Sequence, residues 1–130
     1  MIWRARDVFR HGLLALPLAV VVALATPAAA QAAELLMFRR AGCPWCLTWD
    51  RTVGPIYPET DIGRDLPVVM IDMDRDEAPE VELDRPVRYS PTFVVVDDGV
   101  EIGRIEGYPG EDFFWGLLGR LHEKVPTATQ

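Results

Sequence analysis

The feature that most constrains this chain is a pair of cysteines separated by two residues, Cys43-Pro44-Trp45-Cys46. They are the only cysteines among its 130 residues. An apolar run at residues 35–38 precedes them, and after Cys46 the residues Trp49, Val53 and Tyr57 follow at helical spacing. A strand, a short turn, a C-x-x-C pair and a helix in this order are typical of a dithiol–disulfide redox site.

The first 33 residues have the pattern of a secretory signal peptide. Arginines precede an apolar run at residues 13–25, and small residues follow as far as Ala33. Cleavage after Ala30 or after Ala32 would leave alanine at both the −1 and the −3 position. The apolar run is shorter than the roughly 20 residues of a membrane span, and an uncleaved anchor is the less favoured alternative. We therefore expect a signal peptide over residues 1–33, cleaved near residues 30–33, and a periplasmic protein.

The remaining chain predicts one small acidic domain over residues 34–125, followed by a flexible tail at residues 126–130. The full chain has a net charge of −7, which becomes −9 once the three arginines and one aspartate of the leader are removed. Phosphate binding requires a patch of basic residues, and no basic cluster larger than Arg39-Arg40 occurs, so we predict no nucleic-acid partner.

In an exported protein, this close cysteine pair is better explained by redox chemistry than by a structural role. Disulfides that stabilise exported folds usually join distant segments, because a longer closed loop removes more chain entropy. Half of a metal site is another alternative, but zinc prefers four ligands and the domain otherwise offers only His122. We favour a redox pair, with no metal and no cofactor.

The two sulfurs are expected to have different roles. Cys43 comes just before a predicted helix at residues 44–53, where free backbone N–H groups and the helix dipole stabilise a thiolate. This thiolate would attack a substrate disulfide, and Cys46 would then resolve the mixed disulfide. Cys46 shares a helix face with Trp49 and Val53, so we expect it to be the less exposed sulfur.

The other elements predict a small α/β domain with a four-stranded mixed sheet and helices on both faces. Three further strands are expected, at residues 66–71, 92–96 and 100–106. The unbroken apolar character of the strand at 66–71 suggests burial on both faces. A short helical segment at residues 56–60 should end at residues 61–63, another helical turn is expected near Val81 and Leu83, and the last helix begins at Glu111.

Pro91 opens the strand at residues 92–96, where the lack of an amide donor is tolerated. It follows the small residue Ser90 and precedes a buried run. The Ser90–Pro91 bond is therefore a candidate cis peptide bond, with an ordinary trans proline as the alternative.

Together these features resemble the thioredoxin fold, in a minimal, glutaredoxin-sized form with the order β-α-β-(α)-β-β-α. The chain is similar, more specifically, to the periplasmic thioredoxins of the sulfur-oxidation (Sox) system. The segments that carry this resemblance cover nearly all of the domain and lie at residues 42–46, 53–57, 85–93 and 107–115.

The resemblance implies a thiol–disulfide oxidoreductase with Cys43 as the nucleophile and Cys46 as the resolving thiol of a redox-active disulfide. Ser90 and Pro91 would form a cis-proline loop that faces Cys43 and binds substrate. The implied partners are the Sox sulfur-carrier protein, kept reduced through a reactive cysteine, and a membrane thiol transporter as electron donor. A Dsb-type oxidant or isomerase and a copper(I)-binding chaperone are the alternatives.

The sequence departs from ordinary thioredoxin around the cysteines. Pro44-Trp45 replaces Gly-Pro, the first strand and helix are missing, and Met37 stands where thioredoxins have a buried aspartate. That aspartate helps to remove a proton from the buried cysteine. Asp50 is a candidate replacement, although we favour a solvated role for it.

Three further features have competing interpretations. Trp45 is either a hydrophobic platform for substrate or packs under the cis-proline loop. The aromatic residues 113–115 are expected in the core. The acidic residues Asp72, Asp74 and Asp76 do not meet the pattern of a calcium loop, and a solvated loop is favoured.

Overall fold

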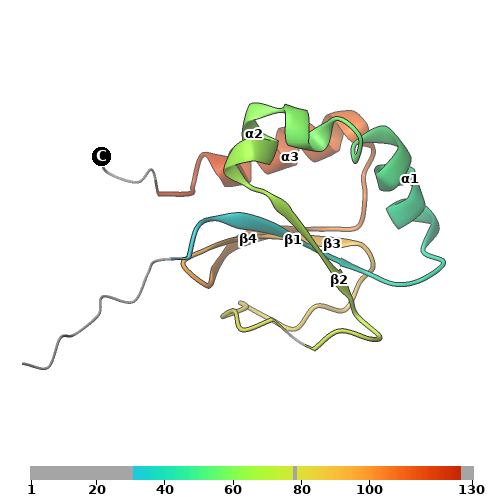
Figure 1. The fold of residues 1–130 in the computed structure, drawn as a ribbon, viewed down its shortest axis with the longest axis horizontal. Coiled ribbons are helices and arrows are strands. Elements are labelled where there is room, and N and C mark those ends of the chain that lie inside the picture. Colours follow the sequence, from blue (N-terminus) through green and yellow to red (C-terminus); the bar gives the residue numbers. More distant parts are fainter. Residues whose placement is uncertain (1–30, 78, 127–130) are drawn as a thin grey trace, which may run out of the picture.

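The computed structural model describes residues 31–77 and 79–126 (Figure 1). The predicted leader up to residue 30, with the first candidate cleavage site, and the last four residues of the predicted tail lie outside the described residues.

The centre of the domain is a four-stranded mixed sheet. Its strands are β1 (Glu34–Arg39), β2 (Val68–Asp72), β3 (Thr92–Asp97) and β4 (Val100–Glu106). The order across the sheet is β2-β1-β3-β4, with β1 parallel to β2 and the other two neighbouring pairs antiparallel. The predicted α/β class and mixed sheet are therefore confirmed.

The prediction that the strand at residues 66–71 is buried on both faces is wrong. This strand, β2, lies at the edge of the sheet. Its residues Val69 and Met70 are 39% and 43% exposed, because no further strand lies beyond β2 and the covering layers reach it only in part. Apolar composition alone does not distinguish an edge strand from a central one.

All the helices lie on one face of the sheet, above it in Figure 1. They are α1 (Pro44–Thr52), the 3₁₀ turn η1 (Tyr57–Glu59), α2 (Asp61–Asp65) and α3 (Glu111–His122). The prediction that a helical segment ends at residues 61–63 is wrong. The Thr60 hydroxyl accepts a hydrogen bond from the Gly63 amide at 2.9 Å, and this N-cap begins α2 instead.

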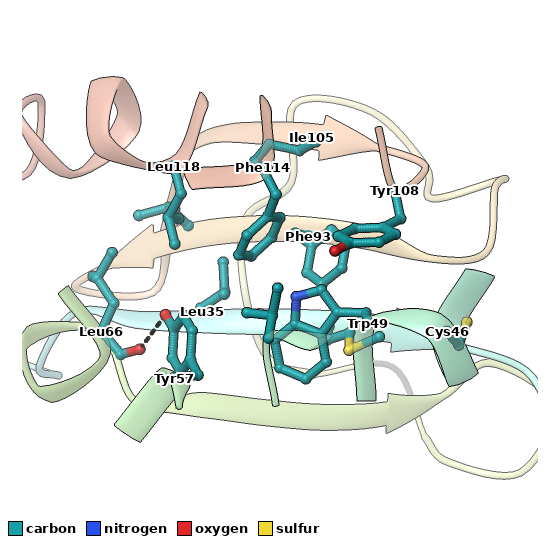
Figure 2. Packing of buried hydrophobic residues seen from close by; sticks show 13 residues of the cluster. Leu35, Cys46, Trp49, Tyr57, Leu66, Phe93, Ile105, Tyr108, Phe114 and Leu118 are labelled. Atoms are coloured by element: carbon teal, nitrogen blue, oxygen red, sulfur yellow. Dashed lines mark hydrogen bonds between the residues drawn. The ribbon is translucent and has the colours of Figure 1, made fainter. Parts of the chain in front are cut away.

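The helix-side core joins these helices to β1, β3 and β4 (Figure 2). It contains Leu35, Met37, Cys46, Trp49, Val53, Tyr57, Leu66, Phe93, Val95, Ile105, Tyr108, Phe114 and Leu118. Phe114 is buried and Trp115 stacks on Tyr57, but Phe113 is 71% exposed, so its predicted place in the core is wrong. Successive helical residues point about 100° apart, and Phe114 takes the side that faces the sheet.

The opposite face of the sheet is covered by an irregular segment, of which residues 73–77 and 79–91 are described (Figure 1). Its apolar side chains Met73, Val81, Leu83 and Val87 pack on a second buried cluster from the strands. The predicted helical turn near Val81 and Leu83 is absent from the described residues, and the expectation of helices on both faces is wrong. Glu82 instead pairs with Val100 in a parallel bridge, which requires extended backbone at this point.

A buried ion pair on β4 holds the covering segment in place. Both Glu101 carboxylate oxygens accept hydrogen bonds from the Arg104 guanidinium at 2.6 Å, and both side chains are almost completely buried. Glu101 also accepts from the Asp84 amide at 2.9 Å, while Arg104 donates to the Arg85 carbonyl at 2.7 Å. The hydrogen bonds from Arg104 are the main reason that the pKa of Glu101 lies below its ordinary value of 4.5.

We expect Glu101→Gln to lower the free energy of unfolding by about 3 kcal/mol at pH 7, because the buried Arg104 loses its bidentate partner and keeps only the Glu106 carboxylate, 3.9 Å away. A carboxylate with a lowered pKa stabilises the fold fully above its ordinary pKa, and this contribution is lost as the pH falls through the lowered value. The difference between the two proteins, measured by urea unfolding, should therefore shrink below pH 4. Glu123→Gln, at an exposed position, is the control, and a difference that does not depend on pH would contradict the prediction.

Candidate redox site

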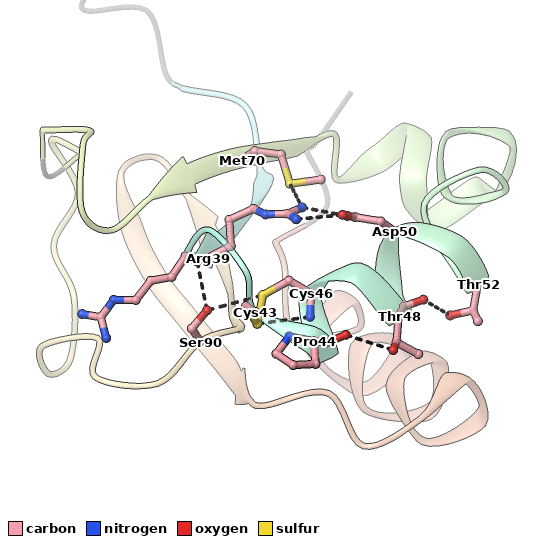
Figure 3. Close-up of polar contacts among 10 residues, drawn as sticks. Arg39, Cys43, Pro44, Cys46, Thr48, Asp50, Thr52, Met70 and Ser90 are labelled. Carbon is pink, nitrogen blue, oxygen red and sulfur yellow. Dashed lines mark hydrogen bonds and ion pairs between the residues drawn. A yellow bond between two sulfur atoms is a disulfide. The ribbon is translucent and has the colours of Figure 1, made fainter.

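Cys43 and Cys46 form a disulfide at the start of α1, with their Cα atoms 5.3 Å apart (Figure 3). The two sulfurs differ in accessibility, because Cys43 is partly exposed whereas Cys46 is completely buried. This confirms the predicted difference in exposure. A thiolate that approaches from solvent can therefore reach only Cys43.

The backbone at the start of α1 is arranged to stabilise negative charge on Cys43. Cys43 is the N-cap residue, and its sulfur accepts a hydrogen bond from the Cys46 amide at 3.2 Å. Pro44 occupies the first turn, where its lack of an N–H group is tolerated. No acidic residue lies in that turn, so no nearby carboxylate repels a negative charge on Cys43. These features favour a thiolate at Cys43 once the disulfide is reduced.

The loop before β3 brings a hydroxyl group to the buried sulfur. The Ser90–Pro91 bond is cis, as predicted. Ser90 Oγ accepts a hydrogen bond from the Arg40 amide at 3.0 Å and lies 3.4 Å from Cys46 Sγ. Because Oγ already accepts from that amide, its own hydrogen is available to the sulfur. The resemblance predicts that Ser90 and Pro91 face Cys43, but the contact observed is between Ser90 Oγ and Cys46 Sγ.

The polar surroundings of α1 include an ion pair between Arg39 and Asp50 that was not predicted. Both Asp50 carboxylate oxygens accept hydrogen bonds from the Arg39 guanidinium at 2.7 Å (Figure 3). These hydrogen bonds are the main reason that the pKa of Arg39 is raised, and they tie α1 to the end of β1. The favoured interpretation of Asp50 as a solvated residue is therefore wrong. Met37, in the place of the family's aspartate, is fully buried in the helix-side core.

Two aromatic side chains are exposed on the segments that carry the cysteines and the cis-proline. Trp45 is 60% exposed, which agrees with a platform for substrate rather than with packing under the loop. Tyr89, directly before Ser90, is also 60% exposed, and it was not among the predicted site residues. Its carbonyl accepts a hydrogen bond from Thr92 Oγ1 at 2.7 Å, which holds the turn around Pro91. An aromatic residue two positions before a predicted cis-proline is the sequence signal that could have identified Tyr89 as a site residue.

A comparison with solved structures identifies the family. The periplasmic thioredoxin SoxS from Paracoccus pantotrophus, in its reduced form, is 50% identical to this chain. The match covers 71% of this chain and 97% of SoxS, with a TM-score of 0.67. The chain belongs to the thioredoxin family. With its C-x-x-C pair at the start of α1, this thioredoxin is a thiol–disulfide oxidoreductase.

More distant matches share the fold of this thioredoxin. Fasciola hepatica thioredoxin is 21% identical, with a TM-score of 0.52 over 68% of this chain and 80% of its own. A thioredoxin-fold protein from Helicobacter pylori is 17% identical, with a TM-score of 0.57 over 71% of this chain and 70% of its own. No family model and no curated protein matches the sequence.

Within residues 31–77 and 79–126 of this thioredoxin, no helix has the length and apolar character needed to cross a membrane. Among the same residues, no group of three or more histidine, cysteine, aspartate or glutamate side chains is placed to hold a metal ion.

We expect Ser90→Ala to slow the reduction of the Cys43–Cys46 disulfide by dithiothreitol about tenfold. Attack on Cys43 releases Cys46 as a thiolate, and a hydrogen bond to a charged group contributes roughly 1.5–3 kcal/mol. Stopped-flow tryptophan fluorescence would measure the rate. Ser90→Thr keeps the hydroxyl and should react at close to the wild-type rate, whereas equal rates for the alanine and wild-type proteins would show that the contact has no kinetic role.

Proposed function

We propose that this protein is an exported reductant that keeps a cysteine of a periplasmic partner protein in the thiol state. The observation that carries this proposal is the difference in exposure of the two sulfurs. Cys43 is partly exposed at the start of α1, and Cys46 is buried one turn further along. The similarity to periplasmic SoxS and the signal-peptide pattern of the leader support a location in the periplasm.

In the proposed reaction, the Cys43 thiolate attacks one sulfur of the partner's disulfide or mixed disulfide. A Cys43–partner disulfide forms, and the other sulfur of the partner's bond leaves as a thiolate that takes a proton from solvent. Cys46 then loses its proton and attacks Cys43 Sγ. The partner cysteine is released as a thiol, and the Cys43–Cys46 disulfide holds the two oxidising equivalents.

The substrate chain would lie across Trp45, Ser90 and Pro91. Trp45 offers an exposed apolar surface, and the loop of Ser90 and Pro91 approaches the disulfide, with Ser90 Oγ 3.4 Å from Cys46 Sγ. The candidate partner is the sulfur-carrier protein of the sulfur-oxidation system. A membrane thiol transporter would return the protein to its dithiol form.

The substrate can be identified with Cys46→Ser, because loss of the resolving thiol should freeze the mixed disulfide at Cys43. We expect one predominant periplasmic protein to be captured, and mass spectrometry of the complex would identify its cysteine. Cys43→Ser is the matched control and should capture nothing, because Cys46 is buried. Absence of any captured periplasmic protein would contradict a specific partner.

The direction of electron flow can be tested by the reduction potential of the pair. A reductant should lie near the thioredoxin value of about −270 mV, whereas a Dsb-type oxidant would lie near −120 mV. Redox equilibration with glutathione, followed by thiol alkylation, would measure the potential. Stoichiometric copper(I) binding without disulfide reductase activity would instead support the copper chaperone.

A further inference from the structure

A cavity of about 560 Å³, widely open to solvent, lies on the face of the sheet opposite the helices. Phe38 and Ile71 contribute from the ends of β1 and β2, and the covering segment supplies most of the other walls. The apolar side chains of the covering segment that line it are Met73, Pro79, Val81, Leu83, Pro86 and Val87. The volume falls within the range of about 300–1,000 Å³ that is typical of small-molecule sites.

The charged groups that line this cavity are mainly acidic. Asp76, Glu77 and Asp84 contribute three carboxylates, and Arg85 contributes one cation. Arg85 is already paired with Glu106, at 2.9 Å. None of the three carboxylates forms a salt bridge with any residue in the described part of the chain. Asp76 accepts a hydrogen bond from the Asp72 amide at 2.7 Å, and all three carboxylates belong to exposed residues. The cavity therefore combines an apolar floor with an exposed rim that is mainly acidic.

We propose that this cavity binds a small organic cation, with an apolar body of about the size of a two-ring aromatic system and an amine. The apolar body would leave water for the surface formed by Phe38, Ile71 and Leu83, and the amine would face the carboxylates. An anion of the same shape would meet repulsion at the same place. This inference concerns a second site and does not depend on the proposed redox function.

The position of the cavity separates it from the disulfide but connects it to the cis-proline loop. The disulfide lies at the start of α1 and the cavity is lined mostly by the covering segment. These two parts of the chain lie on opposite faces of the sheet (Figure 1). Val87, in the cavity wall, precedes Ser90 by only three residues. A bound cation would therefore contact the same segment that carries the hydroxyl next to Cys46.

Two probes of the same shape and opposite charge test the proposal on the wild-type protein. We would titrate 2-naphthylmethylamine and 2-naphthoate into the ¹⁵N-labelled protein and follow the amide resonances. The amine should shift the amides of Ile71, Met73 and Val87, and should bind at least about tenfold more tightly than the carboxylate. Its affinity should fall with added salt, because exposed carboxylates are screened.

Charge-neutralising variants test the role of the acidic groups. Asp76→Asn combined with Glu77→Gln should weaken binding of the amine by roughly tenfold, because the variant loses two exposed ion pairs and each contributes a factor of up to about five. The matched control is Glu59→Gln with Glu123→Gln, which changes the net charge equally at exposed positions away from the cavity and should leave the affinity unchanged.

Several results would overturn the proposal. These are no binding of the amine at millimolar concentration, equal affinity for the two probes, or shifts confined to residues near Trp45. Equal weakening in both double variants would show a general charge effect and not a site. If neither probe binds but the protein captured by Cys46→Ser shifts the cavity amides, the cavity is a protein-docking site and the proposal is wrong.

Discussion

The indole ring of Trp49 anchors α1 to the sheet, and the positions of both sulfurs follow from this contact. The ring is buried against Tyr57, Phe93 and Phe114, with centroid separations of 5.7–6.0 Å. A helix turns about 100° per residue, so a fixed Trp49 also fixes the direction of Cys46, three residues earlier, into the core. Cys43 then lies at the N-cap and stays partly exposed. The packing of the Trp49 ring thus makes one sulfur accessible to solvent and keeps the other buried.

The irregular segment on the other face connects stability, the redox site and the cavity. Extended pairing at Glu82 and the buried Glu101–Arg104 pair hold its middle part against β4. Its end delivers Ser90 to Cys46. This irregular segment also lines a cavity beside the strands. The same backbone geometry therefore positions a hydroxyl group at the buried sulfur and leaves space for a ligand.

The groups that can stabilise negative charge on the two sulfurs are neutral hydrogen-bond donors and not a buried charged side chain. The buried Met37 stands where the resemblance implies an aspartate, and Asp50 is held by both of its oxygens in a pair with Arg39. The donors recorded at the sulfurs are the Cys46 amide and the Ser90 hydroxyl. Stabilisation of a thiolate therefore depends on the helix N-terminus and on one side-chain hydroxyl.

The sequence alone determined the strands, the helix after the C-x-x-C pair, and the difference in exposure of the two cysteines. These features depend on spacings of a few residues, which alternate or repeat in a way that backbone geometry fixes. Tertiary structure decided that β2 is an edge strand, that Phe113 faces solvent, and that an irregular segment and not a helix covers the other face of the sheet. It also decided the contacts of Arg39 with Asp50 and of Cys46 with Ser90, which join residues 11 and 44 positions apart. Such contacts have no local periodic signal, because they exist only after distant segments have packed against the same sheet.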